Sequence, residues 1–154
     1  MIFNKKYREF TVNVISLLFI VLFIYAAISK VLDYETFTIQ LAQSPLLSAY
    51  AGIIAWLVPG GEIVIALFLI FERFRIWAMY ASFTLMVMFT AYIFIILNFS
   101  DFIPCSCGGV LEKLSWTQHL IFNVFFILLA GVAVFLSGRF SSKGSLLLLA
   151  TFAI

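Results

Sequence analysis

The only two cysteines of the 154-residue chain, Cys105 and Cys107, stand one residue apart in the stretch IPCSCGG. An i, i+2 pair closes a disulfide only through a tight, strained turn, and strained or exposed disulfides exchange most readily. So short a loop adds little stability, because closing it removes little entropy from the unfolded chain. Gly108 and Gly109 leave both sulfurs accessible to a partner. The pattern favours thiol–disulfide exchange over two buried thiols, or over a metal site that would add only His119 as a third ligand.

His119 is the only histidine, and we expect it about one turn inside the last spanning helix. A neutral imidazole there can accept a proton from a thiol, and the positive end of the helix can stabilise a thiolate. Asn123 follows four residues later, on the same helix face, and can orient the ring. His119 is therefore a catalytic candidate. The alternative is a histidine that only hydrogen-bonds between helices.

Three further polar residues lie in or beside apolar stretches. Glu62 is predicted near mid-membrane, where an isolated carboxylate costs at least about 2.5 kcal/mol and usually faces the bundle interior. Its functional interpretation is a proton relay or a contact with a quinone. The structural alternative is a hydrogen bond to carbonyls that Pro59 leaves free. Lys30 and Asp33 mark the outer end of the first helix, where a lysine that extends toward the surface and pairs with a nearby acid is ordinary.

The composition indicates a membrane protein: 65% of the residues are hydrophobic, 10% are charged, and the mean hydropathy is +1.19. Crossing about 30 Å of hydrocarbon takes about 20 helical residues. Four apolar stretches are long enough: Thr11–Ser29, Pro45–Phe71, Ile76–Leu97 and Trp116–Leu136. We therefore predict an all-α, polytopic membrane protein with a four-transmembrane-helix bundle over residues 1–140. Residues 141–154 form an apolar C-terminal tail that lies along the inner interface, docks on a partner or begins a fifth helix.

The ends of the helices carry capping residues. Asp33 and Ser44 predict the start and end of a short interfacial helix after the first spanning helix. Ser44 also precedes Pro45, which suits the first position of the next helix because its missing N–H costs nothing there. Ser115 and Gln118 match a capping box at the start of the last spanning helix.

Basic residues near the helix ends predict the orientation. Seven of the nine fall on one side: Lys5, Lys6, Arg8, Arg73, Arg75, Arg139 and Lys143. Only Lys30 and Lys113 fall on the other. Both termini should therefore be cytoplasmic, with segments 31–44 and 98–115 outside. In a bacterial inner membrane the cysteines would then face the periplasm, where disulfides persist. The net charge of +2 is small, and no basic block indicates a nucleic-acid partner.

Three stretches resemble the MauE/DoxX-like family of redox-associated membrane proteins: AAISKVLDYETF, PGGEIVIALFLIF and the cysteine-bearing PCSCGGVLEKLSW. The resemblance covers roughly residues 10–137. It implies a four-helix bundle that works with periplasmic thioredoxin-like proteins in making, breaking or reshuffling disulfides. It also implies that the two cysteines are the redox pair and that Lys30, Asp33 and Glu62 are polar residues shared with the wider family.

The leading prediction is a membrane thiol–disulfide oxidoreductase that exchanges electrons with periplasmic thioredoxin-like partners through Cys105 and Cys107. With a single cysteine pair, it would exchange directly with a protein and a quinone, or with two proteins. The rival prediction is a non-catalytic membrane subunit of a larger envelope complex, in which the cysteines are a structural clip. A small transporter that uses Glu62 for protons is a third interpretation.

Overall fold

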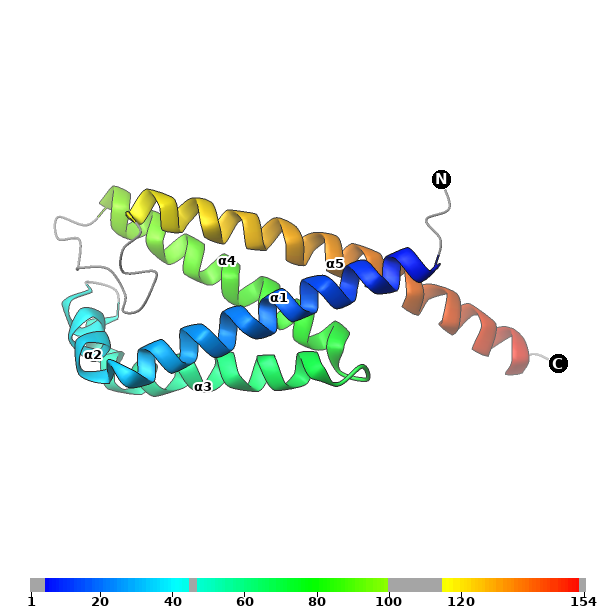
Figure 1. Ribbon diagram of the computed structural model, residues 1–154, viewed down its shortest axis with the longest axis horizontal. Helices are drawn as coiled ribbons and strands as arrows, with labels where there is room; N and C mark the ends of the chain where they lie inside the picture. The colour runs from blue at the N-terminus through cyan, green and yellow to red at the C-terminus, as the bar shows by residue number, and fades with distance from the viewer. Residues whose placement is uncertain (1–4, 45–46, 100–114, 153–154) are drawn as a thin grey trace.

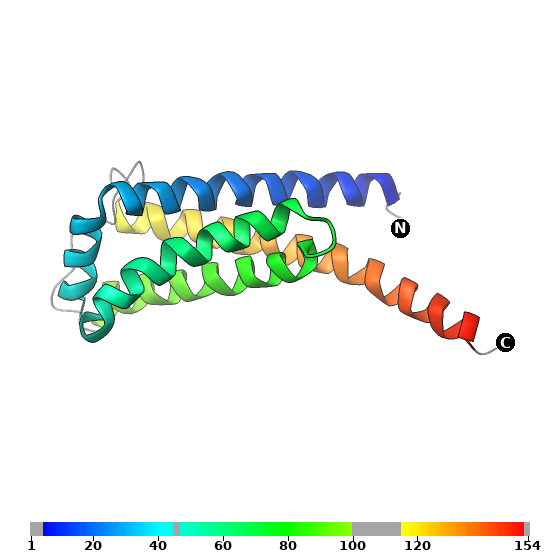
Figure 2. The same cartoon turned by 90° about the horizontal axis from the view of Figure 1, so that it is seen from below.

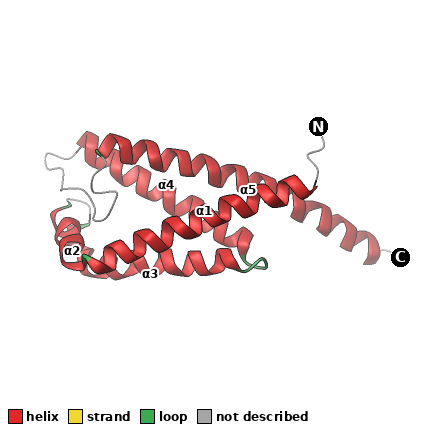
Figure 3. Cartoon of the chain, in the orientation of Figure 1, coloured by secondary structure: helices red, strands yellow, loops and turns green. Residues whose placement is uncertain are grey.

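All the secondary structure in the described part of the chain is helical (Figure 3). The computed structural model describes residues 5–44, 47–99 and 115–152. Its α-helices are α1 (Lys5–Leu32), α2 (Tyr34–Gln43), α3 (Ala51–Ile70), α4 (Arg75–Phe99) and α5 (Trp116–Phe152). The four long helices run lengthwise through the molecule, and α2 lies across one end (Figure 1). Each long helix contains a stretch long and apolar enough to cross a membrane, so the predicted four-helix transmembrane architecture is confirmed.

The connection from α2 to α3 differs from the prediction. Helix α3 begins at Ala51, after a single 3-10 turn over Ser48–Tyr50, rather than at Pro45. The backbone N–H of Leu47 donates to the Ser44 carbonyl at 3.3 Å, and Tyr50 N–H donates to the Leu47 carbonyl at 3.0 Å. These i, i+3 bonds tighten the chain where it turns from the crosswise α2 into the lengthwise α3. Ser44 therefore ends α2 and does not cap α3.

Helix α2 itself follows the prediction. Asp33 occupies its N-cap position and Ser44 its C-cap position, where the Ser44 N–H donates to the Leu41 carbonyl at 3.2 Å. The Asp33 side chain makes no capping hydrogen bond. Helix α2 buries Phe37 and Leu41 against Ala51 and Ala55 of α3. This small cluster joins α2 to the bundle, so the crosswise helix closes one end of the four long helices.

The basic residues predicted to share one side of the membrane lie at one end of the fold. The start of α1, the turn between α3 and α4, and the far part of α5 are all at the end opposite α2 (Figures 1 and 2). Arg75 donates from Nη1 to Asn13 Oδ1 at 2.6 Å, which ties α4 to α1. Arg8 donates to the Leu136 carbonyl, which ties α1 to α5. The cytoplasmic location of this end stays a prediction.

The C-terminal tail continues the last spanning helix. Helix α5 runs without a break from Trp116 to Phe152, and its last turns extend beyond the rest of the bundle (Figure 1). Residues 141–152 are thus the end of α5.

The main core lies between the long helices. Its centre is Phe19 of α1, whose ring packs edge-on against Phe126 of α5 with 5.3 Å between the ring centroids and an interplanar angle of 84°. Small residues on neighbouring helices, Ala66, Ala130 and Ala133, complete this core. Small side chains let helix backbones approach closely, which is how membrane helices commonly pack. The large apolar side chains on the outer surface are available to lipid.

Candidate functional site

An ion pair joins α1 and α3 inside the bundle. The Lys30 Nζ atom lies 2.8 Å from Glu62 Oε1. The Glu62 side chain is 1% exposed and the Lys30 side chain is 13% exposed. A charged side chain within a spanning segment is costly unless it is paired with an opposite charge. Lys30 and Glu62 each provide the opposite charge for the other. Close packing of α1 against α3 positions the two residues, which lie 32 positions apart in the sequence.

Helix geometry directs the Lys30 side chain back along α1, away from the end of the bundle that α2 closes. Side chains on an α-helix tilt toward its N-terminus, and the N-terminus of α1 is at the end far from α2. The ammonium accordingly reaches back to donate to the Ala26 carbonyl at 3.3 Å, and it lies 5.8 Å from the centre of the Phe89 ring. The ordinary alternative, a lysine that extends toward the surface and pairs with a nearby acid, is not what the structure shows. The partner of Lys30 is Glu62.

Glu62 has one carboxylate oxygen engaged and one unengaged. Oε1 accepts from Lys30, whereas the buried Oε2 has no hydrogen-bond partner within the described residues. Helix α3 continues through Pro59, which is itself buried. The structural alternative, a hydrogen bond from Glu62 to carbonyls freed by Pro59, is not what the structure shows. Glu62 instead holds a charged partner on the neighbouring helix and presents a second acceptor.

His119 lies on the first turn of α5, as predicted. The capping box that starts this helix is formed: Ser115 N–H donates to Gln118 Oε1 at 2.9 Å, and Gln118 N–H donates to Ser115 Oγ at 3.3 Å. These bonds satisfy backbone donors that a helix start otherwise leaves unpaired. The cap thus fixes where α5 begins. Asn123 lies four residues on and is 4% exposed.

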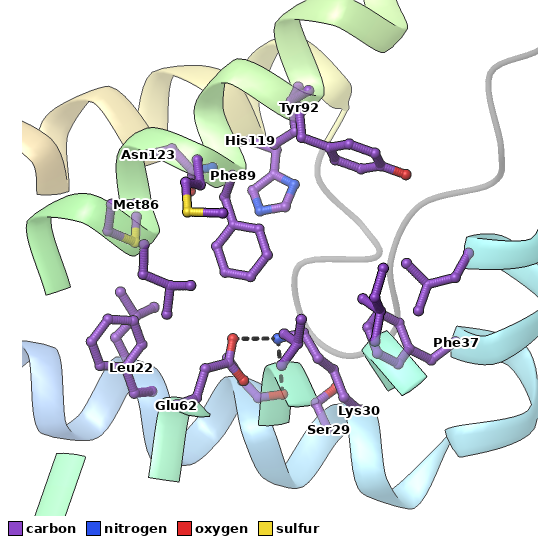
Figure 4. A pocket seen from close by; sticks show the side chains of 18 of the residues that line it. Leu22, Ser29, Lys30, Phe37, Glu62, Met86, Phe89, Tyr92, His119 and Asn123 are labelled. Atoms are coloured by element: carbon purple, nitrogen blue, oxygen red, sulfur yellow. Dashed lines mark hydrogen bonds and ion pairs between the residues drawn. The ribbon is translucent and has the colours of Figure 1, made fainter. Parts of the chain in front are cut away.

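A cavity of about 400 Å³ brings these residues together. Lys30 and Glu62 lie on one wall, and His119 and Asn123 lie on the opposite wall (Figure 4). The remaining lining is mostly apolar and aromatic, with residues such as Leu22, Phe23, Phe37, Leu41, Val58, Phe89, Tyr92 and Trp116. The cavity lies between the main core and the small cluster under α2. It has the character of a small-molecule site, with apolar walls and a few convergent polar groups.

The other predicted residues are not part of this cavity. Asp33 does not line it, and the backbone N–H of Asp33 donates to the Ser29 carbonyl at 3.2 Å as α1 ends. Cys105 and Cys107 lie outside the described residues. The helix ends that flank their segment, at the close of α4 and the start of α5, are at the α2 end of the bundle (Figure 1).

The match to a family model covers most of the chain. The model described as methylamine utilisation protein MauE matches residues 8–136. The chain belongs to the MauE family. This family of membrane proteins is linked to methylamine utilisation, and the match confirms the resemblance seen in the sequence. It spans all the residues that line the cavity of this MauE-family protein. No curated protein and no solved structure matches the chain.

Sequence reasoning missed the ion pair and the aromatic wall. The ion pair had a usable indication, because Lys30 and Glu62 carry opposite charges in or beside stretches that are otherwise apolar. Opposite charges within a membrane usually find one another. Nothing in the sequence indicated the aromatic wall of Phe89, Tyr92 and Trp116. The chain carries 19 phenylalanines, and the sequence does not distinguish those that line a cavity from those that face lipid or pack between helices.

Proposed function

We propose that this MauE-family protein is a membrane thiol–disulfide redox protein whose Cys105 and Cys107 exchange electrons with thioredoxin-like partners in the periplasm. A thiolate of one protein attacks a disulfide sulfur of the other and forms a mixed disulfide. The second cysteine of the attacking pair then displaces the partner's thiolate. In the oxidising direction, Cys105 and Cys107 return as two thiols and the partner leaves with a new disulfide.

The observation that supports the proposal is that His119 lies on the first turn of α5, the helix that follows the two cysteines in the sequence. The start of that helix is capped, and His119 lines the cavity. An imidazole near the sulfurs would accept the thiol proton as the thiolate forms. Asn123 faces the same cavity, although no hydrogen bond joins it to His119 among the described residues. Its proposed role is to line the site with a polar group.

Trapping of the mixed disulfide tests the exchange. Cys105→Ser and Cys107→Ser each remove one member of the pair, and in one of the two variants the resolving thiol is absent. That variant should accumulate a disulfide-linked adduct with a periplasmic thioredoxin-like protein, visible on a non-reducing gel and lost with dithiothreitol. The double variant is the matched control and should form no adduct.

The rival function makes a different prediction for the same variants. If the cysteines only clip a docking segment of a non-catalytic subunit, neither single variant traps a partner. Both variants then weaken co-purification of the protein with its complex. That pair of results would refute thiol exchange.

A further inference from the structure

Glu62, which lines the cavity, carries a buried hydrogen-bond acceptor that has no donor among the described residues. Glu62 Oε2 is fully buried and has no partner within the described residues. Leaving such an oxygen unsatisfied is expensive, and buried polar atoms in proteins nearly always have a partner. Oε2 belongs to a side chain that lines an apolar cavity of about 400 Å³. The arrangement indicates that a ligand with a hydroxyl or N–H donor completes the site.

The charges around this oxygen favour a neutral ligand. Lys30 and Glu62 already neutralise each other at 2.8 Å. The Lys30 ammonium has three donors, and two of them are used by Glu62 and by the Ala26 carbonyl. One donor is thus left beside the unengaged acceptor. The pair can therefore give a hydrogen bond to a carbonyl oxygen and accept one from a hydroxyl.

The walls require a ligand that is otherwise apolar and flat. The Phe89 ring lies beside the ammonium, and Figure 4 shows Tyr92 and His119 on the wall that faces Glu62. All the long helices that enclose the cavity contain stretches long and apolar enough to span a membrane, which favours an occupant that is soluble in lipid. A hydrocarbon chain would fill the space but would leave Glu62 Oε2 without a donor.

We propose that the cavity binds the head group of a lipid-soluble quinone in both its redox states. A ring carbonyl of the quinone accepts from the Lys30 ammonium, and a hydroxyl of the quinol donates to Glu62 Oε2. The binding site stands on the cavity alone, while its use as an electron acceptor rests on the proposed function. In that use, two thiol S–H bonds break and one S–S bond forms. The two electrons and two protons released convert the quinone to the quinol.

Trp116 provides a direct measurement, because it lines the cavity. The other two tryptophans, Trp56 and Trp77, are 64% and 72% exposed and do not line it. Replacing both by phenylalanine leaves Trp116 as the single tryptophan, whose emission can be excited selectively over that of the tyrosines. With the protein in lipid nanodiscs, a short-chain benzoquinone should quench its emission along a saturable curve, and so should the corresponding quinol. Decanol, which has a tail and no ring, should not displace either one.

Two variants test the site against matched controls. Val58→Phe places a larger side chain in the cavity wall, one turn before Glu62 on α3, and should weaken the binding of both ligands at least tenfold. Val64→Phe adds the same ring to the same helix at a position that is 49% exposed, and should leave the binding of both ligands unchanged. Glu62→Gln should weaken the binding of the quinol about tenfold and that of the quinone much less. The reason is that the substitution replaces a charged carboxylate acceptor by a neutral amide. Glu72→Gln makes the same change at an exposed acid and is the control.

The outcomes separate this proposal from the proposed function. Quenching that does not saturate, survives Val58→Phe, is reversed by decanol or ignores Glu62→Gln would overturn the quinone site. The double variant Cys105→Ser/Cys107→Ser should bind quinone normally. If quinone binds as expected but the reduced protein never forms quinol, the cavity assignment stands and thiol-driven reduction fails. If thiol trapping succeeds but quenching does not saturate, the exchange stands and the quinone site falls.

Discussion

Replacing Lys30 by methionine should destabilise the folded bundle by about 3–5 kcal/mol, the usual cost of leaving one member of a buried ion pair alone. The change keeps most of the side-chain length, so the loss comes from charge and not from packing. Glu62 is 1% exposed and lies in the middle of α3, so its carboxylate would be left buried without a charged partner. The carboxylate must then take up a proton or distort the helices around it.

The opposite substitution should cost less. In Glu62→Met, Lys30 keeps its hydrogen bond to the Ala26 carbonyl and its contact with the Phe89 ring. Lys30 is also 13% exposed and lies near the end of α1, so its flexible side chain can turn toward the surface. We expect a loss of about 1.5–3 kcal/mol, the worth of one hydrogen bond to a charged group. The double variant Lys30→Met/Glu62→Met has no unpaired charge and should recover most of the stability.

Reversible unfolding of the purified protein in mixed micelles, with SDS as the denaturant, measures these differences. Lys6→Met is the control, because it removes a lysine that is exposed near the start of α1. The four proteins of the cycle give the coupling energy between the two side chains. The contrary result is a double variant whose destabilisation equals the sum of the two single-variant destabilisations within about 0.5 kcal/mol. That result would show that the two charges do not stabilise each other and would refute the reasoning.

Three further predictions follow from the site and its cap. His119→Phe should slow thiol exchange most near pH 7 and progressively less toward about pH 8.5, where a free thiol ionises unaided; a stopped-flow pH profile with a constant loss at every pH would argue against a proton-accepting imidazole. Ser115→Ala should destabilise the start of α5 by about 1 kcal/mol, whereas Thr117→Ala on the same turn should have little effect; equal thermal shifts would mean that the capping bonds are unimportant. A membrane-impermeant maleimide should label Cys105 in intact, reduced cells, and labelling only after lysis would reverse the predicted orientation.

The helices could be predicted because their causes are local. Each span is an apolar run long enough to satisfy its backbone within the bilayer, and helix is the form that does so without a partner strand. The start of α5 was equally local, since Ser115 and Gln118 bond across one turn. The start of α3 was not, because a proline after a serine suits a helix start but does not reveal that the chain first makes a 3-10 turn over Ser48–Tyr50.

The sequence predicted most of the polar residues of the site, but not which of them lie close together. Glu62, Lys30 and His119 stood out because polar residues are rare in such spans, and the structure brings all three to one cavity. Asp33 stood out for the same reason and lies outside it. The partner of Lys30 was not predicted from the sequence, since Glu62 is 32 positions away and lies on another helix.

By itself, therefore, the amino-acid sequence determined that the chain crosses the membrane, where it crosses, and which few residues could do chemistry. Only the tertiary structure decided which of those residues meet. The physical reason is that the spanning helices are apolar on every side: Phe19 is fully buried and Leu17 is 60% exposed, although both are apolar residues of α1. In water, contrast between apolar and polar faces would set the rotation of each helix. In lipid that contrast is absent, and close packing together with the Lys30–Glu62 pair sets the rotation instead.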